Sequence, residues 1–278
     1  MAARMPLAPA WAVGEFAGTF LLVFFGCGSV AAAVLTGAQV GIFQVAIVWG
    51  LGIATAIYLT GGLSGAHLNP AVTCALATAS GFPWRRVPGY VAVQILGAFA
   101  ASCVLYGVYH ETLHAYETAH GIVRGAAGSE ATAMIFGEYF PSPGGRPLPL
   151  AAARAISPGA AVFIEALGTG ILVLVILGVT HPRNPARPRV LTAAAIGLTI
   201  TLLISLLGPL TMAGFNPARD FAPRLFSSLA GWGRVAFTVN GSGWLTVYIL
   251  GPLAGGQIGA LVYRFFFQPH FDLMVAAD

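Results

Sequence analysis

Charged side chains are scarce in this sequence. Only 8% of the 278 residues are Asp, Glu, Lys or Arg, against about 25% in a typical soluble domain. Lysine is absent, and the 13 arginines are scattered through short polar segments rather than gathered into a basic patch. The net charge of +4 therefore does not predict a nucleic-acid partner. With 57% hydrophobic residues and a mean hydropathy of +0.82, the chain is predicted to be an integral membrane protein.

The residue patterns of enzymes and metalloproteins are also missing. The sequence has no nucleophile–base constellation, phosphate-binding loop or zinc-ligand spacing, so we predict no enzyme activity, no cofactor and no metal site. Cys27, Cys74 and Cys103 lie in apolar stretches and are interpreted as packing residues. Other candidate metal ligands share one polar segment that we expect to be solvated, and we predict no metal site there. They are His110, Glu111, His114, Glu117 and His120.

The apolar residues form long unbroken runs, not the alternating segments of about ten residues that build a transmembrane barrel. A helix needs about 20 apolar residues to cross a bilayer. Two runs, 69–80 and 216–229, are too short to cross. Six runs have the required length: about 11–35, 41–61, 88–109, 160–179, 190–207 and 244–267. The sequence thus predicts an all-α membrane protein with six transmembrane helices and two re-entrant half-helices.

The two halves of the chain are related. "EFAGTFLLVFFG" begins at Glu15 and "EALGTGILVLVILG" at Glu165, and each is followed by a second span, a short run and a third span. Because three is an odd number, the second half starts on the opposite face of the membrane, and the repeat is inverted. We expect one transmembrane domain over residues 1–278. It comprises repeat one at about 8–109, an extramembrane loop at about 110–157 and repeat two at about 158–270.

Each short run begins with Asn-Pro-Ala. Asn is a strong N-cap and Pro is favoured at the first helical position, so the tripeptide predicts a helix start rather than a break in a spanning helix. In an inverted repeat the two half-helices enter from opposite faces, and two pieces of about 18 Å each cover a core of roughly 30 Å. Their N-termini are then expected to meet near the midplane. The motif residues are Asn69, Pro70, Ala71, Asn216, Pro217 and Ala218.

Two helix N-termini that face one passage favour neutral solutes. Each end carries about half a positive charge, and such ends exclude protons and cations. The amides of Asn69 and Asn216 can donate to the oxygen of a passing solute. Non-helical backbone at membrane depth is tolerated where it is buried or lines a wet cavity, so the segments before the two motifs should present carbonyl acceptors. These backbone positions are Gly65, Ala66, His67, Leu68, Gly214 and Phe215.

The motifs resemble those of a known family. "SGAHLNPAVT" and "NPARD", on six spans with two half-helices, are similar to the aquaporin, or major intrinsic protein, family over nearly the whole chain. "VWGLGIATAIYLTGGLSGAHLNPAVT", "NPARDFAPRLFSSLAGWG" and "HGIVRG" resemble the glycerol-facilitator branch, as does Asp220 after Arg219. The resemblance implies an aquaporin-like fold, a passive channel, and a homotetramer in which each chain has its own pore.

By the family's spacing from the two motifs, the selectivity filter falls on Trp49, Ile204, Ala213 and Arg219. Trp49 and Arg219 match the glycerol type, in which an apolar wall faces the carbon chain and donors face the hydroxyls. Glycerol facilitators commonly have Gly and an aromatic residue at the other two places. Ile204 and Ala213 instead resemble the plant nodulin-like intrinsic proteins, which also carry metalloid acids such as arsenite. Tyr248 stands where the glycerol branch usually has Pro.

Glu15 and Glu165 are the only acids in the six predicted spans. Intramembrane acids are candidates for proton coupling, which would make the protein a secondary transporter. Their equivalent places in the repeat favour a structural role instead. Each buried carboxylate would accept hydrogen bonds from the loop backbone before a half-helix, as the family resemblance also implies.

The leading prediction is a passive channel in the lipid bilayer for glycerol and other small uncharged solutes, with some water, that excludes ions and protons. Urea is a further candidate solute. One alternative is a channel for metalloid acids such as arsenite or antimonite. A proton-coupled secondary transporter is a less favoured alternative.

The arginines also predict an orientation. Seven of them, from Arg4 to Arg264, lie on the side of the N-terminus, and six, including Arg154, lie on the other side. Arg124 and Arg146 carry little weight because they lie in the long loop, where the rule barely applies, and Arg219 because it belongs to the expected filter. We therefore predict a multi-pass protein of the plasma or inner membrane with both termini in the cytoplasm.

Overall fold

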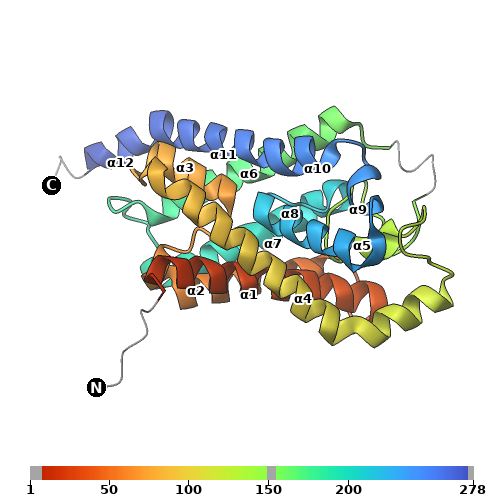
Figure 1. The fold of residues 1–278 in the computed structure, drawn as a ribbon. Coiled ribbons are helices and arrows are strands. Elements are labelled where there is room, and N and C mark those ends of the chain that lie inside the picture. The colour runs from red at the N-terminus through yellow and green to blue at the C-terminus, as the bar shows by residue number, and fades with distance from the viewer. Residues whose placement is uncertain (1–7, 149–154, 275–278) are drawn as a thin grey trace, which may run out of the picture.

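The computed structural model describes residues 8–148 and 155–274, so Arg4 and Arg154 lie outside the described residues. All regular structure in these two ranges is helical, as predicted, and the helices form an elongated bundle (Figure 1). The long helices are α1 (Ala10–Thr36), α2 (Ile42–Ser64), α4 (Val87–Ala119), α6 (Pro158–Thr180), α7 (Thr192–Thr211) and α11 (Gly251–Val262). The shorter ones are α3 (Pro70–Ala79), α5 (Glu130–Ala133), α8 (Pro217–Ser227), α9 (Val235–Thr238), α10 (Gly243–Leu245) and α12 (Gln268–Met274).

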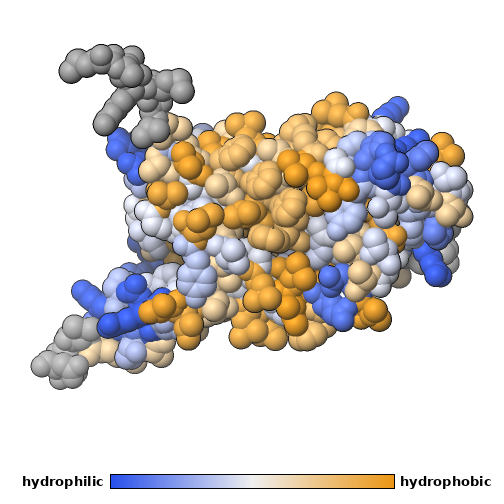
Figure 2. Space-filling view, turned by 90° about the horizontal axis from the view of Figure 1, so that it is seen from below, coloured by the Kyte–Doolittle hydropathy of each residue, from blue (hydrophilic) through white to orange (hydrophobic). Residues whose placement is uncertain are grey.

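Six helical stretches of the described chain are long and apolar enough to cross a membrane, which confirms the six predicted spans. Their bounds are Ala10–Thr36, Ile42–Ser64, Trp84–Ala119, Pro158–Thr180, Arg189–Thr211 and Gly243–Met274. Figure 2 shows hydrophobic residues gathered around the middle of the molecule and hydrophilic residues towards its two ends. This surface suits a multi-pass membrane protein, because the middle of the bundle can face lipid while both ends face water.

The last span is one bent helix rather than a regular one. It joins α10, α11 and α12 through two wide helical turns at Thr246–Leu250 and Tyr263–Phe267. Pro252 follows the first of these turns and has no N–H for the carbonyl four residues earlier, so the helix widens there. The helical stretch begins within one residue of the predicted start at 244 and continues past the predicted end at 267, to Met274.

The helix boundary predicted at residue 109 is wrong. Instead of ending there, α4 continues through the polar segment to Ala119. Leu113 and Glu117, four residues apart on one helix face, are both buried against the protein. Glu117 is paired with Arg124, the Nε atom of which lies 2.8 Å from its carboxylate. These polar residues therefore extend a helix that packs against the protein on one side. The sequence alone predicts a loop there.

The segment after α4 is also more buried than the predicted extramembrane loop. It contains the short helix α5 that was allowed for, but every residue from 129 to 140 is buried. Phe136 packs against Phe226 and Trp232, with ring centroids 5.3 and 5.6 Å apart. The apolar run "AMIFGEYF" explains this burial, since it can pack into the bundle. We call residues 134–140 the inserted segment; it follows α5, which lies beside α8 and α9 at one end of the bundle (Figure 1).

Helix contacts come in matching pairs, as an inverted repeat requires. In the first half α1 packs against α2 and α4, and in the second half α6 packs against α7 and α11. The half-helix α3 lies against α11 of the other half, and α8 lies against α4. The helices α2 and α7, the second spans of the two repeats, pack against each other. The two halves are thus interlocked, each half-helix being held by the third span of the other repeat.

Glycines permit the closest helix contacts. Where α11 crosses α6, a Cβ atom added to Gly255 would overlap the backbone of Ala166, and one added to Gly259 would overlap the backbone of Gly170. Close approach of this kind is the usual way in which membrane helices gain packing energy, because lipid provides no hydrophobic force between them.

We expect Gly255→Ala to destabilise the protein by about 1–3 kcal/mol, because the new methyl group would collide with backbone that cannot rotate away. The measurement is the thermal unfolding midpoint of the purified protein in detergent. Gly107→Ala in α4 is the matched control, since no atom lies near its added Cβ. A midpoint for Gly255→Ala equal to that of the control would contradict this account of the α6–α11 crossing.

Candidate solute pore

The two Asn-Pro-Ala stretches start the half-helices α3 and α8. The Oδ1 atom of Asn69 accepts hydrogen bonds from the N–H groups of Ala71 and Val72 at 2.8 and 3.4 Å. The Oδ1 atom of Asn216 accepts from the N–H groups of Ala218 and Arg219 at 3.0 and 3.2 Å. Pro70 and Pro217 occupy the first helical position, where a missing N–H costs nothing. Each Asn is therefore an N-cap, and neither Pro interrupts a spanning helix.

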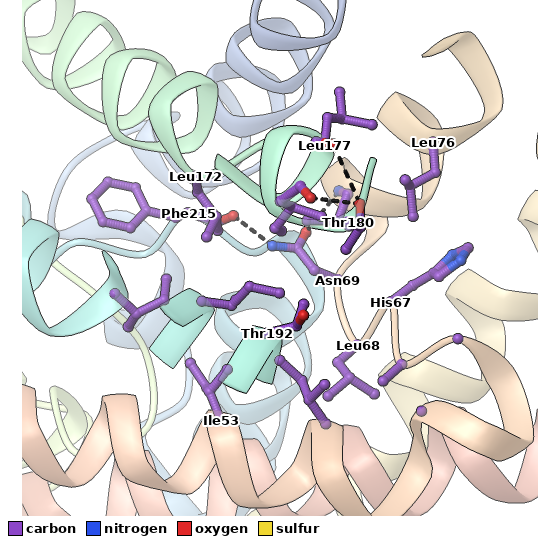
Figure 3. Close-up of a pocket in the computed structure, with 18 of the residues that line it drawn as sticks. Ile53, His67, Leu68, Asn69, Leu76, Leu172, Leu177, Thr180, Thr192 and Phe215 are labelled. Atoms are coloured by element: carbon purple, nitrogen blue, oxygen red, sulfur yellow. Dashed lines mark hydrogen bonds between the residues drawn. The ribbon is translucent and has the colours of Figure 1, made fainter. Parts of the chain in front are cut away.

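The two helix starts are joined by crossed hydrogen bonds. Asn69 Nδ2 donates to the carbonyl of Phe215 at 2.8 Å, and Asn216 Nδ2 donates to the carbonyl of Leu68 at 2.8 Å. The first of these bonds is drawn in Figure 3, where the Phe215 ring points away from Asn69. An amide nitrogen carries two N–H groups, and no second partner is found for either Nδ2 among the described residues. Each Asn thus keeps one donor for another oxygen.

The loops before the half-helices adopt an uncommon backbone conformation. Ala66 and Leu68 have φ values of 50° and 54° in the first loop, and Met212, Ala213 and Phe215 have values of 63°, 59° and 51° in the second. Residues with a Cβ atom rarely adopt such left-handed angles. Both loops must therefore be held in place by surrounding groups.

Two buried carboxylates hold these loops. Glu15 accepts from the N–H groups of His67 and Leu68 at 2.9 and 2.8 Å, and from the Gln94 side chain at 2.7 Å. Glu165 accepts from the N–H groups of Gly214 and Phe215 at 3.0 and 2.8 Å, and from the Thr211 hydroxyl at 2.6 Å. Both acids are fully buried. The contacts are of the kind expected from their equivalent places in the repeat.

The side chain before each capping Asn rests on a glycine. Leu68 packs over Gly18 in α1, and Phe215 packs over Gly168 in α6, so closely that neither glycine has room for a Cβ atom. Each of these glycines follows the buried glutamate of its repeat by three residues. The Phe215 ring is placed between helices, so Asn69 contacts the backbone carbonyl of Phe215 rather than its side chain.

One cavity of about 870 Å³ runs past these groups. At one end it is lined by Thr180, His181 and the loop before α7, and at the other end by Trp49 and Arg219. Twelve predicted residues line it: Trp49, Gly65, Ala66, His67, Leu68, Asn69, Ile204, Ala213, Gly214, Phe215, Asn216 and Arg219. The other six are not among its lining residues: Glu15, Pro70, Ala71, Glu165, Pro217 and Ala218.

Two of the four residues of the expected filter are in contact, and all four line the cavity. The Arg219 guanidinium carbon is 4.4 Å from the centroid of the Trp49 ring, a cation–π distance. The Trp49 ring itself lies against Gly26 of α1, where a Cβ atom would not fit. Ile204 and Ala213 are buried and line the same cavity. This part of the passage combines an aromatic face, two aliphatic side chains and the donors of one guanidinium group.

Sequence reasoning missed the groups that hold Arg219. Its Nε atom lies 2.8 Å from Oε1 of Glu138 in the inserted segment, and its Nη1 atom donates to the carbonyl of Phe136 at 3.1 Å. Glu138 had been placed in a solvated loop, and nothing in its spacing links it to Arg219. The apolar run around it is the only signal that could have shown its burial.

Tyr248 also contributes to this region. Its hydroxyl donates to the carbonyl of Thr211 at 3.0 Å, and its side chain is almost completely buried. Its ring lies near Gly214 and under the guanidinium of Arg224. Tyr248 thus packs against the second loop. The sequence alone had shown only that this position departs from the family pattern.

Comparisons with known proteins agree on one family. The sequence profile of the major intrinsic protein family matches residues 9–263. The chain is 41% identical to a glycerol uptake facilitator protein of Pseudomonas aeruginosa over 265 residues, which are 95% of this chain and 91% of that protein. It is 39% identical to the propanediol uptake facilitator PduF of Citrobacter freundii over 254 residues, which are 91% of this chain and 90% of that protein.

A solved structure is similar along the whole molecule. The aquaglyceroporin from Plasmodium falciparum superposes with a TM-score of 0.80 at 29% sequence identity. The match covers 95% of this chain and 98% of that one. The arrangement of six spans around two half-helices is therefore shared with a solved relative.

We expect Glu165→Gln to lower the free energy of unfolding by about 1–3 kcal/mol, because the new amide NH₂ would face backbone donors and leave one of them unpaired. Thermal unfolding in detergent measures the effect. Glu111→Gln is the control, since the side chain of Glu111 is 93% exposed. Equal unfolding midpoints for the two variants would show that Glu165 does not hold the second loop.

Proposed function

Because this chain belongs to the major intrinsic protein family, we infer that it is a passive transmembrane channel for glycerol and other small uncharged solutes. The observation that carries this inference is the pair of half-helix starts joined by crossed Asn hydrogen bonds beside one long cavity. Relatives named as glycerol and propanediol facilitators support the solute class.

The electrostatics of the passage suit a neutral solute. Two helix N-termini point at the same place in the cavity, and each contributes about half a positive charge. A cation or proton at that point meets repulsion, whereas a hydroxyl or water oxygen can accept from the free N–H of Asn69 or Asn216. Loop carbonyls provide acceptors for the hydroxyl protons of the solute.

We propose that Trp49, Ile204, Ala213 and Arg219 form the selectivity filter. The Trp49 face and the two aliphatic side chains would contact the carbon backbone of glycerol, while Arg219 donates to its hydroxyls. The aliphatic Ile204 and the small Ala213 leave metalloid acids as an alternative solute, since these are also neutral and carry hydroxyl groups.

The remaining functional alternatives are less well supported. A proton-coupled transporter would need an acid that can change its partners, and both buried acids are bound by three donors each in the wall. Membership of a family of channels and facilitators supports a protein that is not an enzyme.

We further propose a homotetramer in the plasma or inner membrane with both termini in the cytoplasm. The start of α1 and the end of α12 lie at the same end of the bundle (Figure 1), as an even number of spans requires. Residues of both repeats line the cavity, which supports one pore in each subunit.

In proteoliposomes, stopped-flow light scattering should show glycerol entry at least about tenfold faster than in empty liposomes, since the pore replaces dissolution in lipid. The same vesicles should be tested with propanediol, urea, water and arsenite. We expect propanediol to follow glycerol, given the related facilitators. Glycerol entry at the rate of empty liposomes would refute the channel assignment, and faster arsenite than glycerol entry would favour the metalloid alternative.

A further inference from the structure

Glu138 brings a second charge to the expected filter. It lies in the inserted segment, 81 residues before Arg219 in the sequence, and its side chain is 1% exposed. Its Oε1 atom is 2.8 Å from Nε of Arg219, the side chain of which is 3% exposed. Ion pairs in such surroundings interact strongly, because little water screens them.

Arg219 is held on three sides. Nε is paired with Glu138, Nη1 donates to the carbonyl of Phe136, and the Trp49 ring covers one face of the guanidinium. No protein acceptor is found for Nη2 among the described residues. The inserted segment therefore fixes the direction in which the remaining N–H groups point, and the side chain lines the cavity in that position.

The backbone of Glu138 is itself tied to α8. Its N–H donates to Oδ1 of Asp220 at 2.8 Å, and its carbonyl accepts from Arg224. Arg224 in turn pairs with Asp220 at 2.7 Å. Two acids and two arginines thus form one buried cluster, in which the charges balance. Without the Glu138 charge, this cluster would carry one net positive charge.

The second carboxylate oxygen of Glu138 lies directly behind the wall of the passage. Its Oε2 atom is buried without a hydrogen-bond partner and occupies the space that a Cβ atom on Gly214 would need. Gly214 lines the cavity next to Ala213. Burial raises the pKa of the Glu138 carboxyl, and the Arg219 guanidinium opposes that rise. The ion pair is thus the main interaction that favours the charged carboxylate.

We propose that Glu138 is a specificity-determining residue that neutralises the charge of Arg219, so that the filter offers hydrogen-bond donors without attracting anions. This inference rests on the proposed channel function. An anion that enters the narrow part of the pore must lose water, and a lone guanidinium would offset part of that cost. A guanidinium that is already paired with a carboxylate attracts the anion much less, so it offsets little of that dehydration cost.

Glu138→Gln separates this electrostatic role from a purely structural one. Glutamine has nearly the same shape and can still accept a hydrogen bond from Nε of Arg219, but it carries no charge. Glu138→Asp does the reverse, keeping the charge on a shorter side chain. Glu117→Gln is the matched control, because it removes an acid from an ion pair with Arg124, also at 2.8 Å, that does not line the cavity.

The measurement is iodide entry into proteoliposomes that hold a halide-sensitive dye, with valinomycin carrying K⁺ as the counter-ion. Each rate is divided by the glycerol rate of the same vesicles. We expect Glu138→Gln to raise this ratio at least about tenfold over the wild type, and Glu138→Asp and Glu117→Gln to leave it low. The double variant with Arg219→Val should lose the iodide entry, because the unpaired charge is then gone.

An unchanged ratio for Glu138→Gln would overturn the proposal, as would equal increases for Glu138→Gln and Glu117→Gln. If the glutamine variant does not assemble, Glu138→Ser removes the same charge, and the same outcomes apply. Wild-type vesicles without glycerol flux would instead refute the proposed function, so the two failures can be told apart.

Discussion

Two hydrogen bonds, from Asn69 to the Phe215 carbonyl and from Asn216 to the Leu68 carbonyl, join the starts of the two half-helices. Each Asn uses its oxygen to cap its own helix and its nitrogen to bind the opposite loop. The positive ends of α3 and α8 are thereby kept together although like ends repel. The position of the loops, the line of the cavity and the free amide donors all depend on this pair of contacts.

The crossed hydrogen bonds of Asn69 and Asn216 form only if other groups hold the two loops in place. The loops before α3 and α8 contain residues with left-handed backbone angles, which Glu15 and Glu165 stabilise through backbone N–H groups. Glycines at Gly18 and Gly168 make room for the side chains of Leu68 and Phe215. The two carboxylates are not among the residues that line the passage, and they bind the loop backbone instead of the solute.

The part of the passage that Trp49 and Arg219 line depends on other contacts. Arg219 belongs to α8, but its guanidinium is held by Glu138 and Phe136 from the inserted segment and by Trp49 from α2. Three regions far apart in the sequence meet there. A change in the inserted segment can consequently alter the filter without touching any residue of the Asn-Pro-Ala motifs.

The amino-acid sequence was sufficient for the parts that follow local rules. Hydrophobic runs of sufficient length marked the six spans, Asn before Pro marked the two helix starts, and the matching order of Glu15 and Glu165 marked the inverted repeat. The sequence was insufficient where polar residues are buried by contacts with distant parts of the chain. The end of α4 at Ala119 and the burial of residues 129–140 depend on long-range packing, which local polarity does not report. For the same reason the pairing of Glu138 with Arg219 became visible only in the folded chain, since it needs the inserted segment to reach α8.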